Sequence, residues 1–315
     1  MNRKTLMSIQ ITIWCCILIF LVSVFGFAIY MNFNEDNVDA FGMGNTVEYT
    51  VKESNIKNID MKFVSEKIQV YIGEYTDIRL VQSTSYNIGE ADRLNLRVVG
   101  ETVTIEKPAL KHLFNFINIF NKREAITLYL PRSYQEGLNV KTVSGNIYLE
   151  GLELEALECD TTSGEVEVED VGVKKELEIN TVSGDINFKD IKSKNIHFNT
   201  TSGDIKLDEI VVEMIECGST SGDIEFKGLG DYFKMSTTSG EIKVALAKMF
   251  KELTSSSVSG DVKVSIPDNS GFKLKYSTTS GDLDSDFDLN QSIYKENNVQ
   301  MTVRTTSGDL DIVKQ

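Results

Sequence analysis

The sequence predicts an all-β protein built as a β-solenoid of roughly 19- to 20-residue coils, preceded by one N-terminal transmembrane helix. Three observations predict this fold class: a recurring Ser-Gly pair, alternation of apolar and polar residues around it, and a long uncharged stretch near the N-terminus. The Ser-Gly pair occurs nine times in a similar frame. Its glycines, which we expect to be structural corners, are Gly145, Gly164, Gly184, Gly203, Gly222, Gly240, Gly260, Gly281 and Gly308.

The repeat has the period expected of stacked strands. Successive glycines are 19, 20, 19, 19, 18, 20, 21 and 27 residues apart. Aliphatic residues such as Ile186 stand two positions after each glycine, and mostly apolar residues such as Ile179 and Leu177 stand five and seven positions before it. Alternation with period two indicates strands with one buried face. Because the apolar offsets are odd before the glycine and even after it, the chain must bend there.

A second bend is expected within each coil, because the parity shifts again seven residues after the glycine. The apolar residues at this position are Leu152, Val171, Ile191, Ile210 and Leu229. Coils of two or three short strands then stack about 4.8 Å apart. Cys159 and Cys217 fall in the same inward position three coils apart, beyond the reach of a disulfide, and are predicted to be buried thiols.

The domain organisation follows from these patterns and from the regions between them. We predict a cytoplasmic N-terminus (1–7), a transmembrane helix (8–31), a juxtamembrane linker (32–45), degenerate β-coils and a cap with a helical insertion near 110–124 (46–137), and the regular solenoid (138–315).

The predicted transmembrane helix is uncharged and long enough to cross a bilayer. Arg3 and Lys4 precede it and the acidic sequence NEDN follows it, which places the C-terminal bulk outside the cell membrane. A cleaved signal peptide is the alternative, since the sequence GFA at 26–28 offers a small-x-small cleavage pattern. The apolar stretch is longer than that of most signal peptides, which favours the uncleaved, single-pass anchor.

The composition is strongly acidic. The formal net charge is −15, and after Met31 the chain carries 30 basic and 47 acidic residues, because Arg3 and Lys4 are the only charged residues before that point. Such a surface disfavours nucleic acid and anionic lipid headgroups, which need a basic patch to displace counterions. It favours metal cations, cationic peptides or basic protein faces instead.

An acidic residue follows most corner glycines. It has two interpretations: each carboxylate accepts backbone N–H bonds at a tight corner, or the row binds Ca²⁺ or a cationic ligand. Calcium needs six to eight oxygen ligands, and the calcium-binding frame Gly-Gly-x-Gly-x-Asp is absent, so the metal site stays a speculative one. The residues of this acidic row are Asp185, Asp204, Asp223, Glu241 and Asp261.

Catalytic constellations are missing from the sequence. The two histidines, His112 and His197, are distant from each other, and Ser-Gly-Asp lacks the Gly-x-Ser-x-Gly frame of a nucleophile elbow. We therefore predict a protein that is not an enzyme and needs no cofactor.

Two segments are candidates for contacts with a partner. In the predicted insertion, one helical face is either packed on the solenoid or exposed for a membrane or a partner protein. The final strand, DLDIVKQ, is expected to end the stack as an open edge. The candidate contact residues of the insertion are Leu113, Phe114, Phe116, Ile117 and Phe120.

The repeat resembles that of a bacterial domain family of unknown function whose members are regarded as candidate adhesins and carry tandem TxSGD-aliphatic repeats. The matching segments include TVSGNIYL, TTSGEVEV, TVSGDINF, TTSGDIKL and TTSGEIKV, and the resemblance covers roughly residues 45–315. It implies a β-repeat fold and provides no catalytic residues. The N-terminal anchor is similar to that of members associated with envelope-stress responses.

These expectations combine into one functional hypothesis with two alternatives. The chain is predicted to be a non-catalytic, membrane-anchored, extracytoplasmic binding or scaffolding element of the bacterial envelope, with an envelope protein or the cell wall as partner. One alternative is an adhesin-like surface module that binds cations, cationic peptides or wall glycans through its acidic face. The other is a solenoid enzyme that acts on polysaccharides.

Overall fold

The structure of the chain is a computed structural model. The chain divides into two compact units, Met1–Gly42 and Met43–Gln315, of which the first lies outside the described residues. The described residues of the second unit are nearly all strand and turn, with one short 3-10 helix, η2 (Glu90–Asp92). The structure describes residues 44–52, 55–108, 123–269, 271–295 and 299–315. An all-β, solenoid-like fold is therefore confirmed for this unit.

The predicted transmembrane helix, residues 8–31, lies outside the described residues. Across the ranges that are described, no helix combines the length and the apolar character needed to cross a membrane. The anchor consequently stays a prediction from the sequence.

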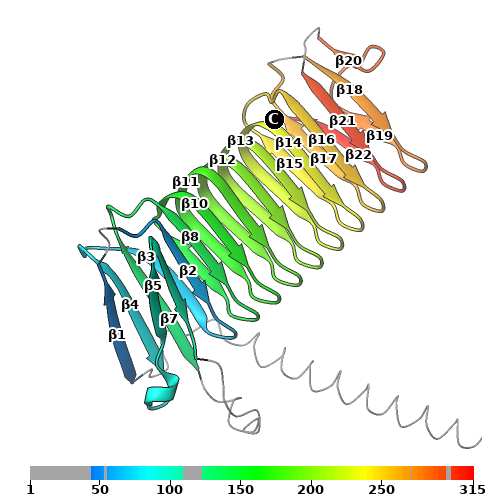
Figure 1. The fold of residues 1–315 in the computed structure, drawn as a ribbon. Coiled ribbons are helices and arrows are strands. Elements are labelled where there is room, and N and C mark those ends of the chain that lie inside the picture. Colours follow the sequence, from blue (N-terminus) through cyan, green and yellow to red (C-terminus); the bar gives the residue numbers. More distant parts are fainter. Residues whose placement is uncertain (1–43, 53–54, 109–122, 270, 296–298) are drawn as a thin grey trace, which may run out of the picture. The chain divides into compact units, whose positions relative to one another are not determined.

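Each coil contributes one strand before its corner glycine and one after it, and these strands stack side by side into two faces (Figure 1). We call them the pre-corner sheet and the post-corner sheet. The pre-corner strands are, in spatial order, β5 (Asn95–Val99), β6 (Thr102–Glu106), β2 (Asn58–Lys62), β8 (Gly137–Lys141), β10 (Glu153–Asp160), the second parts of β11 (Val166–Asn180), β12 (Ile186–Asn199), β13 (Ile205–Gly218) and β14 (Ile224–Thr237), then β16 (Glu252–Ser257), β21 (Gln300–Arg304), β18 (Phe272–Ser277) and β20 (Ile293–Tyr294).

The post-corner sheet runs parallel to this series. Its strands are, in spatial order, β1 (Asn45–Val51), β4 (Ile78–Thr84), β7 (Glu124–Pro131), β3 (Lys67–Gly73), β9 (Ile147–Glu150), the first parts of β11–β14, then β15 (Ile242–Leu246), β17 (Val262–Ile266), β22 (Leu310–Lys314) and β19 (Leu283–Ser285).

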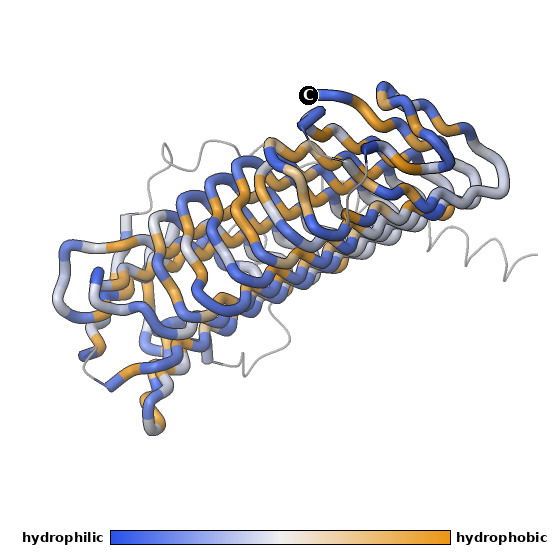
Figure 2. The backbone as a smooth tube through the Cα atoms, turned by 90° about the horizontal axis from the view of Figure 1, so that it is seen from above, coloured by the Kyte–Doolittle hydropathy of each residue, from blue (hydrophilic) through white to orange (hydrophobic). Residues whose placement is uncertain are grey.

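The register places like residues on one another, which fills the space between the sheets. Ile186 pairs with Ile205, and interior side chains of the two sheets meet, with the ring centroids of Phe188 and Phe198 4.7 Å apart. Apolar and polar residues alternate along each coil (Figure 2). Each buried aliphatic or aromatic side chain stabilises such a stack by about 1.5–3 kcal/mol. The interior is thus a packed core along the coils.

The second bend is confirmed in the coils of β11, β12 and β13. Six residues after the corner glycine, Asp170, Asp190 and Glu209 adopt left-handed backbone angles, with φ of 53°, 50° and 58°. Polar residues with short side chains tolerate this conformation best among non-glycine residues. The expectation for Leu229 was wrong: it pairs with exposed Val211 and is only half-buried, because this 18-residue coil is one residue short.

The chain order is not the spatial order at the N-terminal end of the solenoid. The coil β6–β7 lies outside the earlier coil β2–β3, and antiparallel strands β5, β4 and β1 continue the two faces beyond it. In the coil β2–β3, Glu66 occupies the position of the corner glycine, since Ile68 pairs with Ile147.

The expectation that the final strand forms the open edge was wrong. Strand β22 lies between β17 and β19, and β21 lies between β16 and β18 (Figure 1). The reason is packing: the last coil carries Leu310 and Ile312 at its two inward positions, whereas the coil that ends the stack has polar Ser285 at the position equivalent to Ile312. The coil with the complete aliphatic set occupies the interior, and the poorer coil ends the stack.

The outermost coil is closed by aromatic residues. Phe272, Phe287 and Tyr294 form a cluster with ring centroids 4.8–5.9 Å apart. Strand β20 pairs antiparallel with β18, and Lys314 lies over the Phe287 ring at 5.1 Å. This cluster covers apolar atoms that another coil would otherwise cover.

The prediction that Cys159 and Cys217 are buried thiols, too far apart for a disulfide, is confirmed. Cys159 and Cys217 are both free and buried, in equivalent positions of strands three coils apart. Burial raises the pKa of both thiols, so they remain protonated within the core.

One of the buried hydroxyls without a partner lies at a core position of β16. Ser255 lies between Met235 and Val303 in the register, is fully buried, and its hydroxyl makes no hydrogen bond. Ser255→Ala removes this buried hydroxyl, and we expect the free energy of unfolding to rise by about 1 kcal/mol. Urea unfolding measures the gain, and Ser256→Ala, at the adjacent outward position, serves as the control. A loss of stability in Ser255→Ala would show that the hydroxyl is satisfied.

Candidate functional site

In six of the nine corners, from Gly145 to Gly240, the N–H of the glycine donates to the hydroxyl of the residue three positions before it. The N–H of Gly203 donates to Thr200 Oγ1 at 3.0 Å, and the same bond recurs in neighbouring coils with Thr181 and Ser219 as acceptors. These hydroxyl residues are buried beneath the corner. A Ser or Thr side chain bonded to a nearby N–H is a common way to hold a tight turn.

The residue after the glycine links one corner to the next. One carboxylate oxygen of Asp204 accepts the N–H of Asp223 from the following coil at 2.9 Å. Asn146 accepts the N–H of Glu165 through its amide oxygen at 3.1 Å. The further bonds of this kind run from Asp204 N–H to Asp185, from Glu241 N–H to Asp223, from Asp309 N–H to Asp261 and from Asp282 N–H to Asp309. The acidic row is therefore a hydrogen-bonded ladder along the corners.

Along the ladder, the residues are bonded in the order in which the coils stack, which differs from their order in the sequence. Asp261 accepts from Asp309, and Asp309 accepts from Asp282, which lies earlier in the sequence but farther along the stack. Within the described corners, Glu165 and Glu241 make no such bond to the next N–H. The longer side chains turn instead to Asn187 and Lys243.

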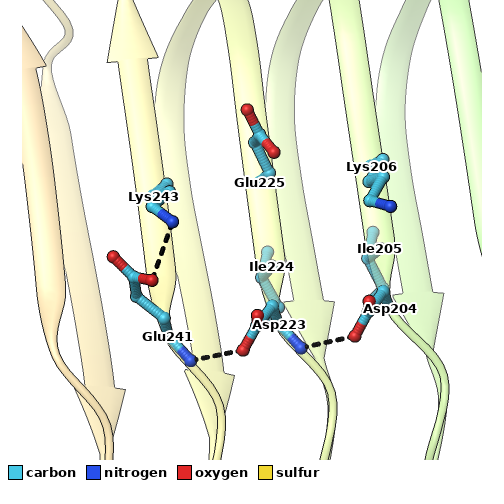
Figure 3. A pocket seen from close by; sticks show the side chains of 8 residues that line it. All are labelled: Asp204, Ile205, Lys206, Asp223, Ile224, Glu225, Glu241 and Lys243. Carbon is cyan, nitrogen blue, oxygen red and sulfur yellow. Dashed lines mark hydrogen bonds and ion pairs between the residues drawn. The ribbon is translucent and has the colours of Figure 1, made fainter.

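The ladder borders a shallow surface pocket of about 60 Å³ (Figure 3). One row of its lining is acidic, and the neighbouring outward row alternates in charge, with Lys206, Glu225 and Lys243. Lys243 pairs with Glu241 at 2.7 Å. The acidic residues predicted as a speculative metal site thus lie in one line, with lysines beside them.

Metal ligands do not gather in this part of the molecule. Among the described residues, no group of three or more His, Cys, Asp and Glu side chains has a geometry that could hold a metal ion. His197 lies outward between strands that carry Glu178 and Glu216, and its Nδ1 is 3.9 Å from the Glu216 carboxylate.

The Asp204 carboxylate offers a test of what the ladder requires. Asp204→Ala removes the acceptor of the Asp223 N–H, and we expect a loss of about 1 kcal/mol in unfolding free energy. Asp204→Asn keeps an acceptor, as Asn146 does, and should leave stability near that of the wild type. Urea unfolding distinguishes the two. If both variants lose the same stability, the negative charge itself is required and the ladder explanation is wrong.

A second cluster of charges, which the sequence did not reveal, lies at the first degenerate corners. Lys107 donates to Glu66 at 2.9 Å and to Glu124 at 2.5 Å, and both carboxylate side chains are only 5% exposed. Glu66 also accepts the N–H groups of Val64 and Ser65, and Glu124 accepts from Gln82 and Tyr86. This cluster lies at the corners of the coils β2–β3 and β6–β7, which lack the Ser-Gly pair.

The pKa values follow from this arrangement. Burial alone would raise the pKa of the Glu66 carboxyl, but the Lys107 ammonium and two backbone N–H groups outweigh it and hold the pKa below its usual value. Burial would lower the pKa of Lys107, and the two carboxylates raise it above normal. Burial and the bond to Glu124 raise the pKa of the Tyr86 hydroxyl.

The candidate contact residues of the insertion, Leu113, Phe114, Phe116, Ile117 and Phe120, lie outside the described residues. Strand β7 begins at Glu124, the last residue of the predicted insertion. The two described ends of the insertion are held close together by the bonds of Lys107 and Glu124.

The sequence also missed an outward row of tyrosines near the N-terminal end of the post-corner sheet. Tyr129 of β7, Tyr71 of β3 and Tyr148 of β9 lie on adjacent strands, with ring centroids 6.1 and 5.8 Å apart. Tyr75 packs on Tyr129 at 5.8 Å. The only sequence signal for this row is that one tyrosine stands at an outward position of each of the segments YIG, LYLP and IYLE.

Stacked coils, a filled core and laddered corners define a β-solenoid repeat protein. The chain belongs to the Toastrack DUF4097 family, whose model matches residues 56–313. No curated protein matches the sequence.

Two solved structures share the fold. A candidate adhesin from Parabacteroides merdae is 13% identical, with a TM-score of 0.52, and the match covers 86% of this chain and 98% of that one. A candidate lipid-binding protein from Parabacteroides distasonis is 18% identical, with a TM-score of 0.50 and coverage of 86% and 97%. At these identities the likeness concerns the fold.

Proposed function

We propose that the protein is a non-catalytic, membrane-anchored element of the bacterial envelope that binds a partner outside the cell membrane. The observation that carries the proposal is the packed interior: side chains of both sheets fill the space between them, so ligands meet only the outer surface. That surface repeats from coil to coil, which suits an extended partner. The family membership and the adhesin description of a structural neighbour support a binding role.

The anchor and the orientation rest on the uncharged stretch 8–31 and on the charges that flank it. Protease treatment of intact spheroplasts tests them. We expect the unit Met43–Gln315 to be digested while the membrane stays sealed. Protection of this unit until the membrane is lysed would overturn the proposed location.

The binding role is tested by crosslinking in living cells followed by mass spectrometry, with and without envelope stress. We expect an envelope protein or cell-wall material to be recovered with the full-length chain. A stress-dependent change in recovery would support a role in the envelope-stress response. Recovery of no partner under either condition would contradict the scaffolding function.

The second candidate is an adhesin-like module that binds cations or cationic peptides through the acidic ladder. It is favoured by the row of carboxylates from Asp185 to Asp261, in which each of the four aspartates keeps an oxygen beyond the one that accepts a backbone N–H. The ladder itself needs no metal, so we expect Ca²⁺ to raise the melting temperature no more than NaCl of equal ionic strength. A rise specific to Ca²⁺ that Asp204→Asn abolishes would favour this second function.

A further inference from the structure

The outward tyrosines form the one aromatic strip on the post-corner sheet among the described coils. From β11 onward, the outward positions of this sheet carry mostly charged, amide or small residues, such as Glu167, Asn187 and Lys206. Among the described residues, the outward aromatic side chains of this sheet therefore lie on β7, β3 and β9 and in the turn after β3. We call Tyr75, Tyr129, Tyr71 and Tyr148 the tyrosine strip.

The strip runs across the strands, along the direction in which coils stack. Interplanar angles of 29°, 52° and 69° between successive rings leave a mixture of ring faces and edges along it. Tyr75 is 41% exposed and the other three rings are half-buried. The inward neighbours on each strand, such as Val70 and Leu128, are fully buried and fix the strand positions beneath the strip.

Polar groups lie along the edge of the strip. Gln69 donates its amide to Tyr71 Oη at 2.9 Å, and Tyr148 Oη donates to Glu150 at 3.0 Å. At the other end Arg79 lies 4.7 Å from the centroid of Tyr75 and pairs with Glu48. Rings with hydroxyl, amide and carboxylate groups at their edges offer apolar surface and hydrogen-bond partners together.

Charge selects among the ligands that such a surface accepts. Glu150 and Glu169 continue the row of Tyr129 and Tyr71 on the next strands, and the chain after Met31 is strongly acidic. Anionic polymers and anionic lipid surfaces are repelled. A bilayer interface normally requires exposed aliphatic or tryptophan side chains with basic residues beside them. The strip has no such apolar side chains, and Arg79 at its end is paired with Glu48.

A protein partner also fits the strip poorly. Stable protein interfaces bury about 800 Å² on each side around an apolar centre, whereas this strip is a single row of rings with charged residues on both sides. A chain of sugar rings matches the row better: its C–H faces contact aromatic rings, and its hydroxyls meet the phenol, amide and carboxylate groups.

We propose that the tyrosine strip binds an uncharged glycan strand, with successive pyranose rings lying along Tyr129, Tyr71 and Tyr148. This inference rests on the proposed binding function, and it specifies the surface and the chemical class of the partner. It assigns binding to the N-terminal coils and not to the acidic ladder of the later ones.

The test uses the full-length protein in detergent and two probes. These are insoluble chitin, an uncharged β-1,4-linked N-acetylglucosamine polymer, in a cosedimentation assay, and a β-1,4-linked N-acetylglucosamine hexamer, in calorimetry. We expect binding of both probes by the wild type and a roughly tenfold weaker affinity in the double variant Tyr71→Ala, Tyr148→Ala. Tyr232→Ala, on β14 of the same unit, is the matched control and should bind like the wild type.

Folding is checked separately by thermal denaturation of each variant. If the double variant is unstable, Tyr71→Phe and Tyr148→Phe keep the rings and remove the hydroxyls, and we expect a smaller loss of affinity with normal stability. Equal binding by the wild type and the folded double variant would overturn the proposal. So would the absence of glycan binding by the wild type, or a tyrosine-dependent binding to vesicles of uncharged lipid in its place.

The experiments distinguish a failure of the tyrosine strip as the binding site from a failure of the proposed envelope function. A protein partner recovered by crosslinking, together with no glycan binding, would keep the envelope function and reject the strip as its site. Glycan binding that survives the loss of the tyrosines but is lost in Asp204→Asn would move the site to the acidic ladder.

Discussion

Gly203→Ala should destabilise the solenoid by about 3–5 kcal/mol in urea unfolding. A Cβ atom at this position would lie 2.0 Å from the carbonyl oxygen of Gly184 in the preceding coil. The neighbouring atom is backbone and is held by the ladder, so it does not move without separating the coils. Clashes that force the backbone apart belong to the most destabilising class of single substitutions.

A matched control uses another glycine. A Cβ at Gly89 meets only Asp92 Oδ2 at 3.4 Å, an ordinary contact, and its φ of −81° suits alanine. Gly89→Ala should therefore match the wild type or exceed it slightly. Hydrogen exchange on both variants locates the effect, with faster exchange expected in β12 and β13 for Gly203→Ala alone. Equal unfolding of the two variants would contradict the close contact between coils.

Lys107→Met should cost about 3 kcal/mol at neutral pH, because it leaves the carboxylates of Glu66 and Glu124 buried without their cation. In the wild type the depressed pKa of Glu66 raises the free energy of unfolding at pH values above 4.5, the ordinary pKa of a glutamate. This contribution is lost as the pH falls through the folded-state pKa. In the variant, burial without the lysine raises the pKa of Glu66. Protonation of this carboxyl at lower pH then removes the cost of burying an unpaired charge.

The difference between the two proteins should thus be large at pH 7 and shrink as the pH falls toward 4. Urea unfolding at pH 7, 6, 5 and 4 measures it. Adding Glu66→Gln to the variant should recover part of the loss at pH 7, because one buried charge is removed. Lys227→Met, which breaks an exposed pair with Asp208, is the control and should show no comparable pH dependence. A pH-independent loss in Lys107→Met would mean that packing and not charge explains it.

The repeating part of the fold was predictable because the sequence of every coil meets the same packing requirements. Ile186 and Ile205 recur in one frame since each fills an equivalent place in the core, and the glycines recur because a backbone oxygen of the neighbouring coil excludes a side chain. The function of the acidic residue was left open between two interpretations. The bond from Asp223 N–H to Asp204 shows how the carboxylate serves the corner.

The ends of the solenoid were not predictable by the same reasoning. Sequence periodicity gives the spacing of coils along the chain and no information on their order in space. Ser285, polar where every other coil has an apolar residue, was the signal that its coil ends the stack. The cluster of Lys107, Glu66 and Glu124 joins residues up to 58 positions apart, from coils whose corners have lost the Ser-Gly pair, and only the fold brings them together.

The insertion of the last coil between two earlier neighbours affects how the protein is made and how its length can change. A solenoid stacked in chain order can add each coil as it is synthesised. Here ordered growth stops at β17, and the coil β18–β19 lacks its neighbour until the final residues, Gln300–Lys314, have been made. Duplication of a coil before β17 would lengthen the stack and keep its aromatic end. A coil added after Gln315 would have no edge to extend.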